Sequence, residues 1–193
     1  MITRKKFDFI KKKYGYCASW AVWADVGETP TSNMGDLTVF DIEKNPSLLS
    51  ILNPNVVLVG LNFSKDVKLE TFANFHAGGS AKDFKTRYAL KGTDCWGAYM
   101  TDILKDYPEM DSTKVDKYLS DNPDFEKQNV ESFHQELEDI GSENPKLVAF
   151  GDKVYKILIK NFPNYIIVKI PHYSHFINQD DYKDQVLEVL KQN

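Results

Sequence analysis

The chain has 193 residues and a formal net charge of −4, and 42% of its residues are hydrophobic. Its aromatic share of 13% excludes a disordered protein, because disordered chains contain too few large apolar side chains to bury a core. No run of about 18 uncharged apolar residues is present, so we expect no membrane-spanning helix.

The cysteine content and the first residues indicate the cellular compartment. The two cysteines, Cys17 and Cys95, provide neither a disulfide framework nor a CxxC metal motif, and we predict neither a metal nor a cofactor. Residues 1–13 are basic but lack the apolar run and small-residue cleavage site of a secretory signal. We therefore expect a reduced, cytoplasmic protein. No Pro-, Gly- or Ser-rich linker divides the chain, so residues 1–193 are predicted to form one domain, which we expect to be monomeric.

The first half of the chain contains one clear strand. A helix is predicted near residues 3–13. Residues 15–50 are rich in Gly, Thr, Asn and Asp, and we interpret them as mostly loop with a helical turn near residues 46–52. Residues 56–61 form a continuous apolar run, which is typical of a strand with both faces covered. A further strand is predicted around residues 98–103.

The second half predicts a parallel crossover. A helix is expected at residues 123–140, where apolar residues recur on one face. The apolar runs 146–150 and 165–170 flank a helix that Asp152 can cap, which is the pattern of a strand–helix–strand unit. A last helix is predicted at residues 180–191. These elements predict an α/β fold: a three-layer α/β/α sandwich with a mostly parallel central sheet of about four strands.

Three polar clusters follow the predicted strands. Residues 60–64 (Gly-Leu-Asn-Phe-Ser), residues 100–105 (Met-Thr-Asp-Ile-Leu-Lys) and residues 170–175 (Ile-Pro-His-Tyr-Ser-His) each lie where a strand ends. In open α/β sheets, ligands bind outside the carboxyl ends of the strands. Polar residues also follow strands simply because turns require them, so a cluster of this kind taken alone is more often an ordinary turn than a site. Their joint position predicts a binding site at one edge of the sheet.

Four segments together resemble motifs of the uracil-DNA glycosylase superfamily. The first motif of that family, G-x-N-P-G or G-Q-D-P-Y, corresponds to residues 60–64, and its T-N-x-x-K motif corresponds to residues 101–105. A strand–Gly–helix unit matches residues 149–154, and the final H-P-S motif matches residues 172–174. The order and spacing of these motifs fit the family over roughly residues 55–175. The resemblance supports the three-layer fold and implies a pocket that receives a base flipped out of nucleic acid.

The resemblance implies a role for each matching residue. Asn62 would position a water molecule, because an amide cannot act as a strong general base, and His172 would donate a hydrogen bond to the base as negative charge develops on it. Asp102 would read the Watson–Crick edge of the base. One aromatic residue of the family stacks on the base, and either Phe72 or Phe75 could take that place. The other residues assigned to the site are Phe63 for base binding and the nucleic-acid contacts Ser64, Lys105, Tyr173 and Ser174.

Three residues depart from the family pattern. Phe63 and Tyr173 stand where the family has proline, so the loop that inserts into DNA differs in shape and stiffness. Asp102 replaces the usual asparagine. Because an ionised carboxylate only accepts hydrogen bonds, Asp102 suits an amino-bearing base better than the O4 carbonyl of uracil. Burial that raises the pKa of Asp102 would make it a donor and partly restore uracil recognition.

Two other functions remain open. The pocket could hold a nucleobase, a nucleotide or single-stranded nucleic acid without cleaving it. Alternatively, the acidic segment 108–145, which holds eleven Asp or Glu against three Lys, could dock a basic protein or mimic the charge of DNA. A solvated helical face explains the same acidic segment without a partner. We expect DNA or a nucleobase-containing ligand to be the partner, and no membrane.

Overall fold

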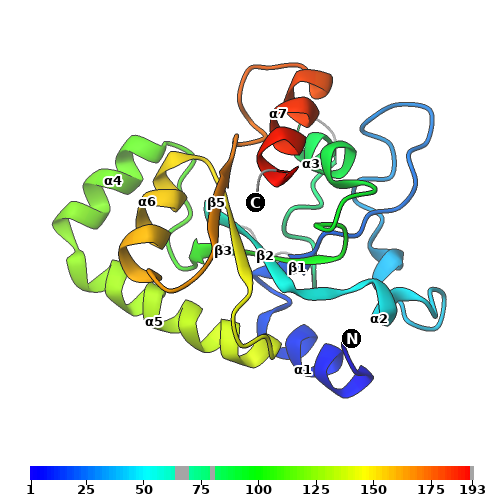
Figure 1. Ribbon diagram of the computed structural model, residues 1–193, viewed down its shortest axis with the longest axis horizontal. Coiled ribbons are helices and arrows are strands. Elements are labelled where there is room, and N and C mark those ends of the chain that lie inside the picture. Colours follow the sequence, from blue (N-terminus) through cyan, green and yellow to red (C-terminus); the bar gives the residue numbers. More distant parts are fainter. Residues whose placement is uncertain (64–69, 79–80, 192–193) are drawn as a thin grey trace.

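The computed structural model describes residues 1–63, 70–78 and 81–191 (Figure 1). Within these residues the centre is a five-stranded sheet in the order β1-β3-β2-β4-β5. The strands are β1 (Ala18–Trp20), β2 (Asn53–Asn62), β3 (Ala98–Leu104), β4 (Lys146–Phe150) and β5 (Ile167–Ile170). β2 to β5 are parallel, whereas β1 pairs antiparallel with β3. The predicted three-layer α/β sandwich with a mostly parallel sheet is therefore confirmed.

The helices include all those that the sequence predicts. The predicted ones are α1 (Arg4–Tyr14), α2 (Leu48–Ile51), α5 (Pro123–Ile140), α6 (Asp152–Asn161) and α7 (Gln179–Lys191). Helices α3 (Asp83–Leu90) and α4 (Ser112–Asp121), the 3-10 turn η1 (Leu37–Phe40) and strand β1 are additions. The interpretation of residues 15–50 as mostly loop is wrong at β1.

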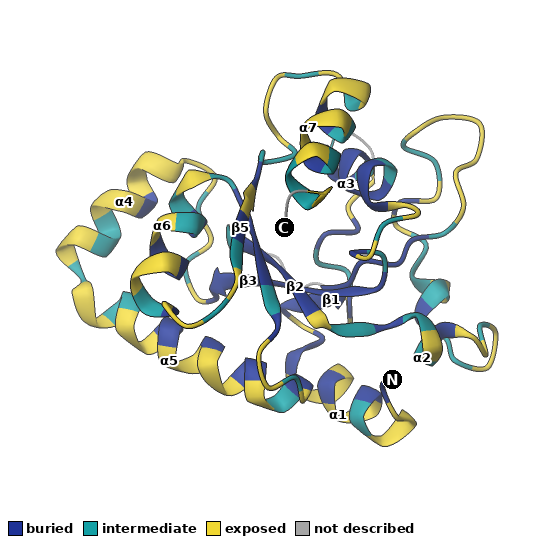
Figure 2. Cartoon of the chain, in the orientation of Figure 1, coloured by how far each residue is buried: buried dark blue, intermediate teal, exposed yellow. Residues whose placement is uncertain are grey.

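Two separate cores cover the two faces of the sheet (Figures 1 and 2). The first, which we call the α5-side core, is formed by α1, α5 and α6 and includes Phe7, Phe133 and Leu158. The second, the α7-side core, is formed by α3 and α7 and includes Leu90 and Val186. The candidate site described below lies on the face of the sheet that the α7-side core covers.

Two further observations concern the whole described chain. In residues 1–63, 70–78 and 81–191, no helix combines the length and the apolar character that crossing a membrane requires. The thiols of Cys17 and Cys95 are free and buried. Burial raises the pKa of Cys17 to about 12 and that of Cys95 to about 11, so both thiols stay protonated and poorly nucleophilic at neutral pH.

Candidate functional site

The residues predicted at the strand ends meet on one face of the sheet. On the four parallel strands, the residues that enter the α7-side core are even-numbered: Val56 and Leu58, Ala98 and Met100, Val148 and Phe150, and Val168 and Ile170. Side chains alternate between the two faces of a strand. Gly60, Asp102 and His172 continue these even-numbered rows at the carboxyl ends of β2, β3 and β5. The sheet therefore brings them to the same face and the same edge.

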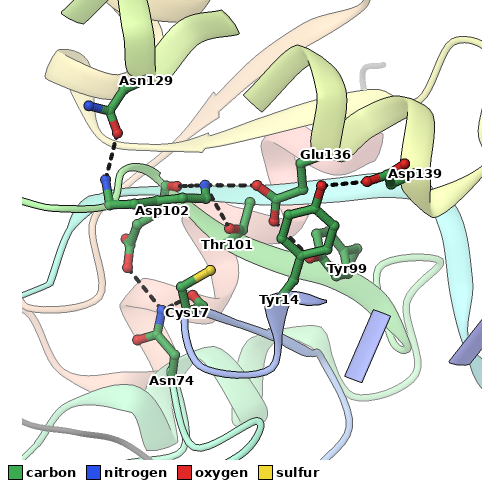
Figure 3. A network of polar contacts seen from close by, with 10 residues as sticks. Tyr14, Cys17, Asn74, Tyr99, Thr101, Asp102, Asn129, Glu136 and Asp139 are labelled. Atoms are coloured by element: carbon green, nitrogen blue, oxygen red, sulfur yellow. Dashed lines mark hydrogen bonds and ion pairs between the residues drawn. The ribbon is translucent and has the colours of Figure 1, made fainter. Parts of the chain in front are cut away.

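Asp102 and Gly60 form the centre of this site. They are register partners on β3 and β2, and a side chain at position 60 would collide with Oδ1 of Asp102. The other carboxylate oxygen accepts a hydrogen bond of 2.9 Å from Nδ2 of Asn74. Nδ2 of Asn74 also donates to the carbonyl oxygen of Cys17 at 2.8 Å, so both its hydrogens are used and the amide is fixed. Figure 3 shows the Asp102 carboxylate turned toward Asn74.

Two buried carboxyl groups at the site hold their protons unusually tightly. Burial raises the pKa of Asp102 to about 6, and the hydrogen bond from Asn74 and the charge of Lys105 only partly oppose this. Burial likewise raises the pKa of Asp83, the first residue of α3, to about 6. Tyr173 lies near both carboxyl groups. Its burial raises the pKa of its hydroxyl well above the ordinary value, and the charges of Asp83 and Asp102 raise it further. The site therefore contains groups that change protonation near neutral pH.

His172 is held as a neutral ring with a defined tautomer. Its Nδ1 accepts a hydrogen bond of 3.1 Å from the backbone N–H of Ser174, and the Ser174 hydroxyl lies 2.8 Å from the same nitrogen. A nitrogen that accepts from a backbone N–H carries no proton, so the proton of the neutral ring is on Nε2. Burial, with a smaller contribution from His175, lowers the pKa of His172 to about 4. At neutral pH, His172 therefore offers an uncharged Nε2–H donor.

Aromatic rings line the site between Gly60 and His172. The ring of Phe75 lies 3.2 Å from the position of a Cβ at Gly60, and it stacks on Phe150 at a centroid distance of 6.3 Å. Phe150 packs edge-on against Tyr173 at 5.4 Å, and Tyr173 stacks on His172 at 4.4 Å. Phe75 and Phe150 are buried in the α7-side core, whereas the stacked rings of Tyr173 and His172 are half-buried and form the accessible end of this aromatic wall.

Asn62 ends β2 and is half-buried. Its Nδ2 lies within hydrogen-bond distance of the carbonyl oxygens of Phe63 (2.9 Å), Tyr107 (2.8 Å) and Glu109 (2.9 Å). Three acceptors thus compete for two hydrogens, and the amide nitrogen has no capacity left for a ligand. Among the described residues Oδ1 has no hydrogen-bond partner, so it is the end of this side chain that can hold a water molecule. Phe63 itself packs against the α5-side core.

Two further predicted site residues lie on the α5 side of the sheet, as Phe63 does. Phe72 is fully buried in the α5-side core, with its ring 5.5 Å from Phe7 and 5.1 Å from Phe40. It therefore cannot stack on a ligand in this conformation, whereas Phe75, which is also buried, lies on the opposite side of the sheet beside Gly60. Lys105 is also buried, and its ammonium group forms an ion pair of 2.7 Å with Glu136 of α5. The predicted contact between Lys105 and a phosphate is incompatible with this placement.

Lys105 belongs to a buried polar network that also includes Tyr99, Asp102 and Glu136, three residues that Figure 3 labels. Its Nζ donates to the backbone oxygen of Asp102 at 2.7 Å, while the hydroxyl of Tyr99 donates to Glu136 at 2.7 Å. Burial opposes the charge on Lys105, but Glu136, Cys17 and Asp102 outweigh it, so the pKa of Lys105 is raised. The backbone N–H of Lys105 donates to Asn129 at 2.8 Å. This network fixes the end of β3 from the face opposite the Asp102 carboxylate.

The remaining predicted residues divide between the site and the surface. Ser174 is exposed, and it serves His172 as described above. Tyr173 is half-buried within the aromatic wall. Ser64 lies outside the described residues. Sequence reasoning missed Asn74, Asp83 and Phe150; Phe150 follows the same even-numbered row as its strand neighbours, so alternation along β4 is the signal that would have found it.

A groove away from the candidate site is lined in part by the acidic segment 108–145. It has a volume of ≈ 820 Å³ and lies between α4, α5 and α6. Lysines of α6 neutralise part of its acidic wall: Lys160 pairs with Glu126 at 2.7 Å, and Lys153 pairs with Asp116. The acidic segment is therefore partly neutralised within the fold, which weakens the interpretation of it as a DNA mimic.

Across residues 1–63, 70–78 and 81–191, His, Cys, Asp and Glu side chains form no group of three or more that could hold a metal ion. Comparisons of the chain with protein-family models, with curated proteins and with solved structures found no match.

Proposed function

We propose that this protein is a monofunctional glycosylase of the uracil-DNA glycosylase type, which hydrolyses the N-glycosidic bond of a base flipped out of nucleic acid. The observation that carries the proposal is the neutral His172 ring, whose Nε2–H is left available by the bonds from Ser174 to Nδ1. This donor lies at the edge where Asp102 and the aromatic rings of Phe75 and Tyr173 also gather. A base reader, stacking surfaces and an anion stabiliser are the parts that base excision requires.

The reaction needs no cofactor chemistry. The bond between C1′ of the sugar and the base nitrogen breaks, and its electron pair stays on the base. Nε2–H of His172 donates to an oxygen of the base and stabilises the developing negative charge, which a neutral imidazole can do. Water adds its oxygen to C1′ and loses a proton, and the departing base takes up a proton. Oδ1 of Asn62 would hold that water in line with C1′.

Asp102 would set the class of base. Oδ2 already accepts from Asn74, so Oδ1, which lies against Gly60, is the oxygen that would be left for a ligand. At pH 7.5 the ionised form predominates, because the pKa of Asp102 is about 6. An ionised carboxylate accepts hydrogen bonds from amino or imino groups and repels carbonyl oxygens. We therefore expect a base that presents an N–H donor rather than a carbonyl to Oδ1.

An exposed aromatic side chain supports the same function. Phe176 lies four residues after His172 and is completely exposed to solvent. Proteins that flip or kink bases insert apolar wedges of this kind between base steps. In the proposed complex, Phe176 would fill the gap that the extruded base leaves.

A nucleobase-binding protein without catalysis is the second candidate. It is favoured by Asn62, whose Nδ2 is committed to the backbone carbonyls of Phe63, Tyr107 and Glu109. If the whole amide serves only to close this loop, water is not positioned and the base is bound without cleavage. A ligand that raises the melting temperature without being cleaved would identify this case.

The test is an incision assay on labelled oligonucleotides. Single and double strands carrying uracil, hypoxanthine, xanthine or a modified amino-bearing base are incubated with wild type, His172→Ala and His134→Ala, and abasic sites are cleaved with alkali. His134 is exposed on α5 and serves as the matched control. We expect incision at one class of base, abolished in His172→Ala and retained in His134→Ala. No incision by folded wild type across the panel would exclude the glycosylase.

A further inference from the structure

The turn after His172 presents one aromatic side chain to solvent. The backbone N–H of His175 donates to the His172 carbonyl at 3.0 Å, and the N–H of Ile177 donates to the His175 carbonyl at 2.8 Å. The second bond closes a three-residue turn with Phe176 at its centre. Phe176 is 108% exposed, whereas phenylalanine side chains in folded proteins are most often buried in the core. Two backbone hydrogen bonds therefore stabilise a turn whose central residue exposes an apolar ring to solvent.

Lys85, a buried residue of α3, donates hydrogen bonds to this turn on both sides of Phe176. Nζ of Lys85 donates to the carbonyl oxygen of His175 at 2.9 Å and to that of Ile177 at 2.7 Å, the residues on either side of Phe176. Lys85 is 5% exposed, and no carboxylate among the described residues lies within ion-pair distance of its ammonium. Burying an ammonium without a counter-ion is unfavourable unless its hydrogen bonds compensate. The two hydrogen bonds to the turn therefore compensate for the burial of the Lys85 ammonium.

The helix that carries Lys85 is itself anchored. Arg87, two residues further along α3, donates to the carbonyl oxygens of Ala24 at 3.0 Å and Pro30 at 2.7 Å. Asp83 at the start of α3 accepts from the backbone N–H of Ala77 at 2.9 Å. Lys85 therefore links the Phe176 turn to a fixed part of the fold rather than to another loop.

We infer that Lys85 is a positioning residue that holds the His175–Ile177 turn so that Phe176 projects as a rigid wedge into a nucleic-acid duplex. This inference rests on the proposed function. A wedge lowers the barrier to extruding a base only if its own position is already fixed, because ordering it on binding would consume the same free energy. A single strand has no stack to open, so the wedge matters for duplex substrates and not for single strands.

The experiment measures the ratio of kcat/KM on a duplex to kcat/KM on a single strand of the same sequence. Lys85→Met keeps the aliphatic stem and removes the donors, and we expect it to lower this ratio by roughly tenfold or more. Phe176→Ala, which leaves the interior untouched, should lower the ratio at least as much. Lys82→Met removes an equal charge from an exposed position next to α3, and it should leave the ratio unchanged.

A double variant tests whether Lys85 acts through the wedge. Adding Lys85→Met to Phe176→Ala should change the ratio by less than about twofold, because the two residues serve one step. Equal losses on both substrates in Lys85→Met, an unchanged ratio in Phe176→Ala, or a wild type that acts on single strands only would each overturn the inference. A wild type that neither cleaves nor binds any oligonucleotide would instead overturn the proposed function, and the inference with it.

Discussion

The carboxylate of Asp102 lies over the backbone of Gly60, in the space that a side chain at position 60 would occupy. The two residues are register partners on adjacent parallel strands, so this contact joins β2 and β3 at the edge where the site is built. Glycine is required at position 60 for steric reasons. The contact also fixes which carboxylate oxygen, Oδ1, is presented next to Phe75.

Gly60→Ala should damage both the site and the fold. The new methyl group collides with Oδ1 of Asp102 and crowds the Phe75 ring, so we expect a loss of roughly 1–3 kcal/mol in the free energy of unfolding, together with loss of ligand binding. Chemical denaturation measures the first effect. Gly78→Ala is the matched control, because a Cβ there meets nothing within 4 Å. Equal stabilities of the two variants would show that Asp102 does not occupy this space.

Asp102→Asn should change the class of base that is accepted. The amide can donate to a carbonyl oxygen, which the ionised carboxylate repels at pH 7.5. We expect the variant to gain activity or binding toward uracil relative to amino-bearing bases. Wild type should shift in the same direction as the pH falls through about 6, the pKa of Asp102, and the variant should not. Identical base preferences in the two proteins at pH 7.5 would exclude Asp102 as the base reader.

Asp83→Asn should stabilise the protein at neutral pH. The folded-state pKa of Asp83, about 6, lies above its ordinary value, so the folded protein binds this proton more tightly than the unfolded chain. Wild type therefore loses stability as pH rises through about 6, and the asparagine variant escapes that loss while keeping the bond from Ala77. Melting temperatures should agree only below the ordinary pKa of 3.8, where Asp83 is protonated in both states, and should favour the variant by a margin that grows up to about pH 6 and then stays constant. The exposed Asp94→Asn should show no such difference.

The sequence predicts the strands and the edge at which they present polar residues, because continuous apolar runs and strand-end clusters are local patterns. It does not reveal β1, which is three residues long, or α3, whose buried face includes Lys85 and Arg87 instead of a simple apolar stripe. It also cannot separate Phe72 from Phe75. Each is buried, and only the tertiary fold places them in opposite cores.

The sequence also does not predict that Lys105 is buried. Its partner Glu136 lies on a distant helix, and a lysine after a strand is ordinarily solvated. Glu136→Gln should lower the free energy of unfolding by roughly 3–5 kcal/mol, because it leaves the buried ammonium without a counter-ion. Lys105→Met should be less stable than wild type, yet it should leave the salt dependence of oligonucleotide binding unchanged. A shallower salt dependence in Lys105→Met would restore the predicted phosphate contact.

His172 should be neutral with its proton on Nε2. Nitrogen chemical shifts of the imidazole, assigned by comparison with His172→Ala, should report this tautomer at pH 6 and a pKa of about 4. Because that pKa is lower than the ordinary value of His, the folded protein loses stability as the pH falls from about 6.5 through 4. A protonated ring at pH 6, or a proton on Nδ1, would contradict the hydrogen bond from Ser174.

A glycosylase must release the free base into solution, where mass spectrometry detects it. Wild type is incubated with the panel of modified oligonucleotides, and His172→Ala, with its melting temperature checked, runs beside it. We expect free base and an intact abasic strand in equal amounts from wild type, and neither from His172→Ala. Absence of free base from every oligonucleotide, or equal release by His172→Ala, would contradict it.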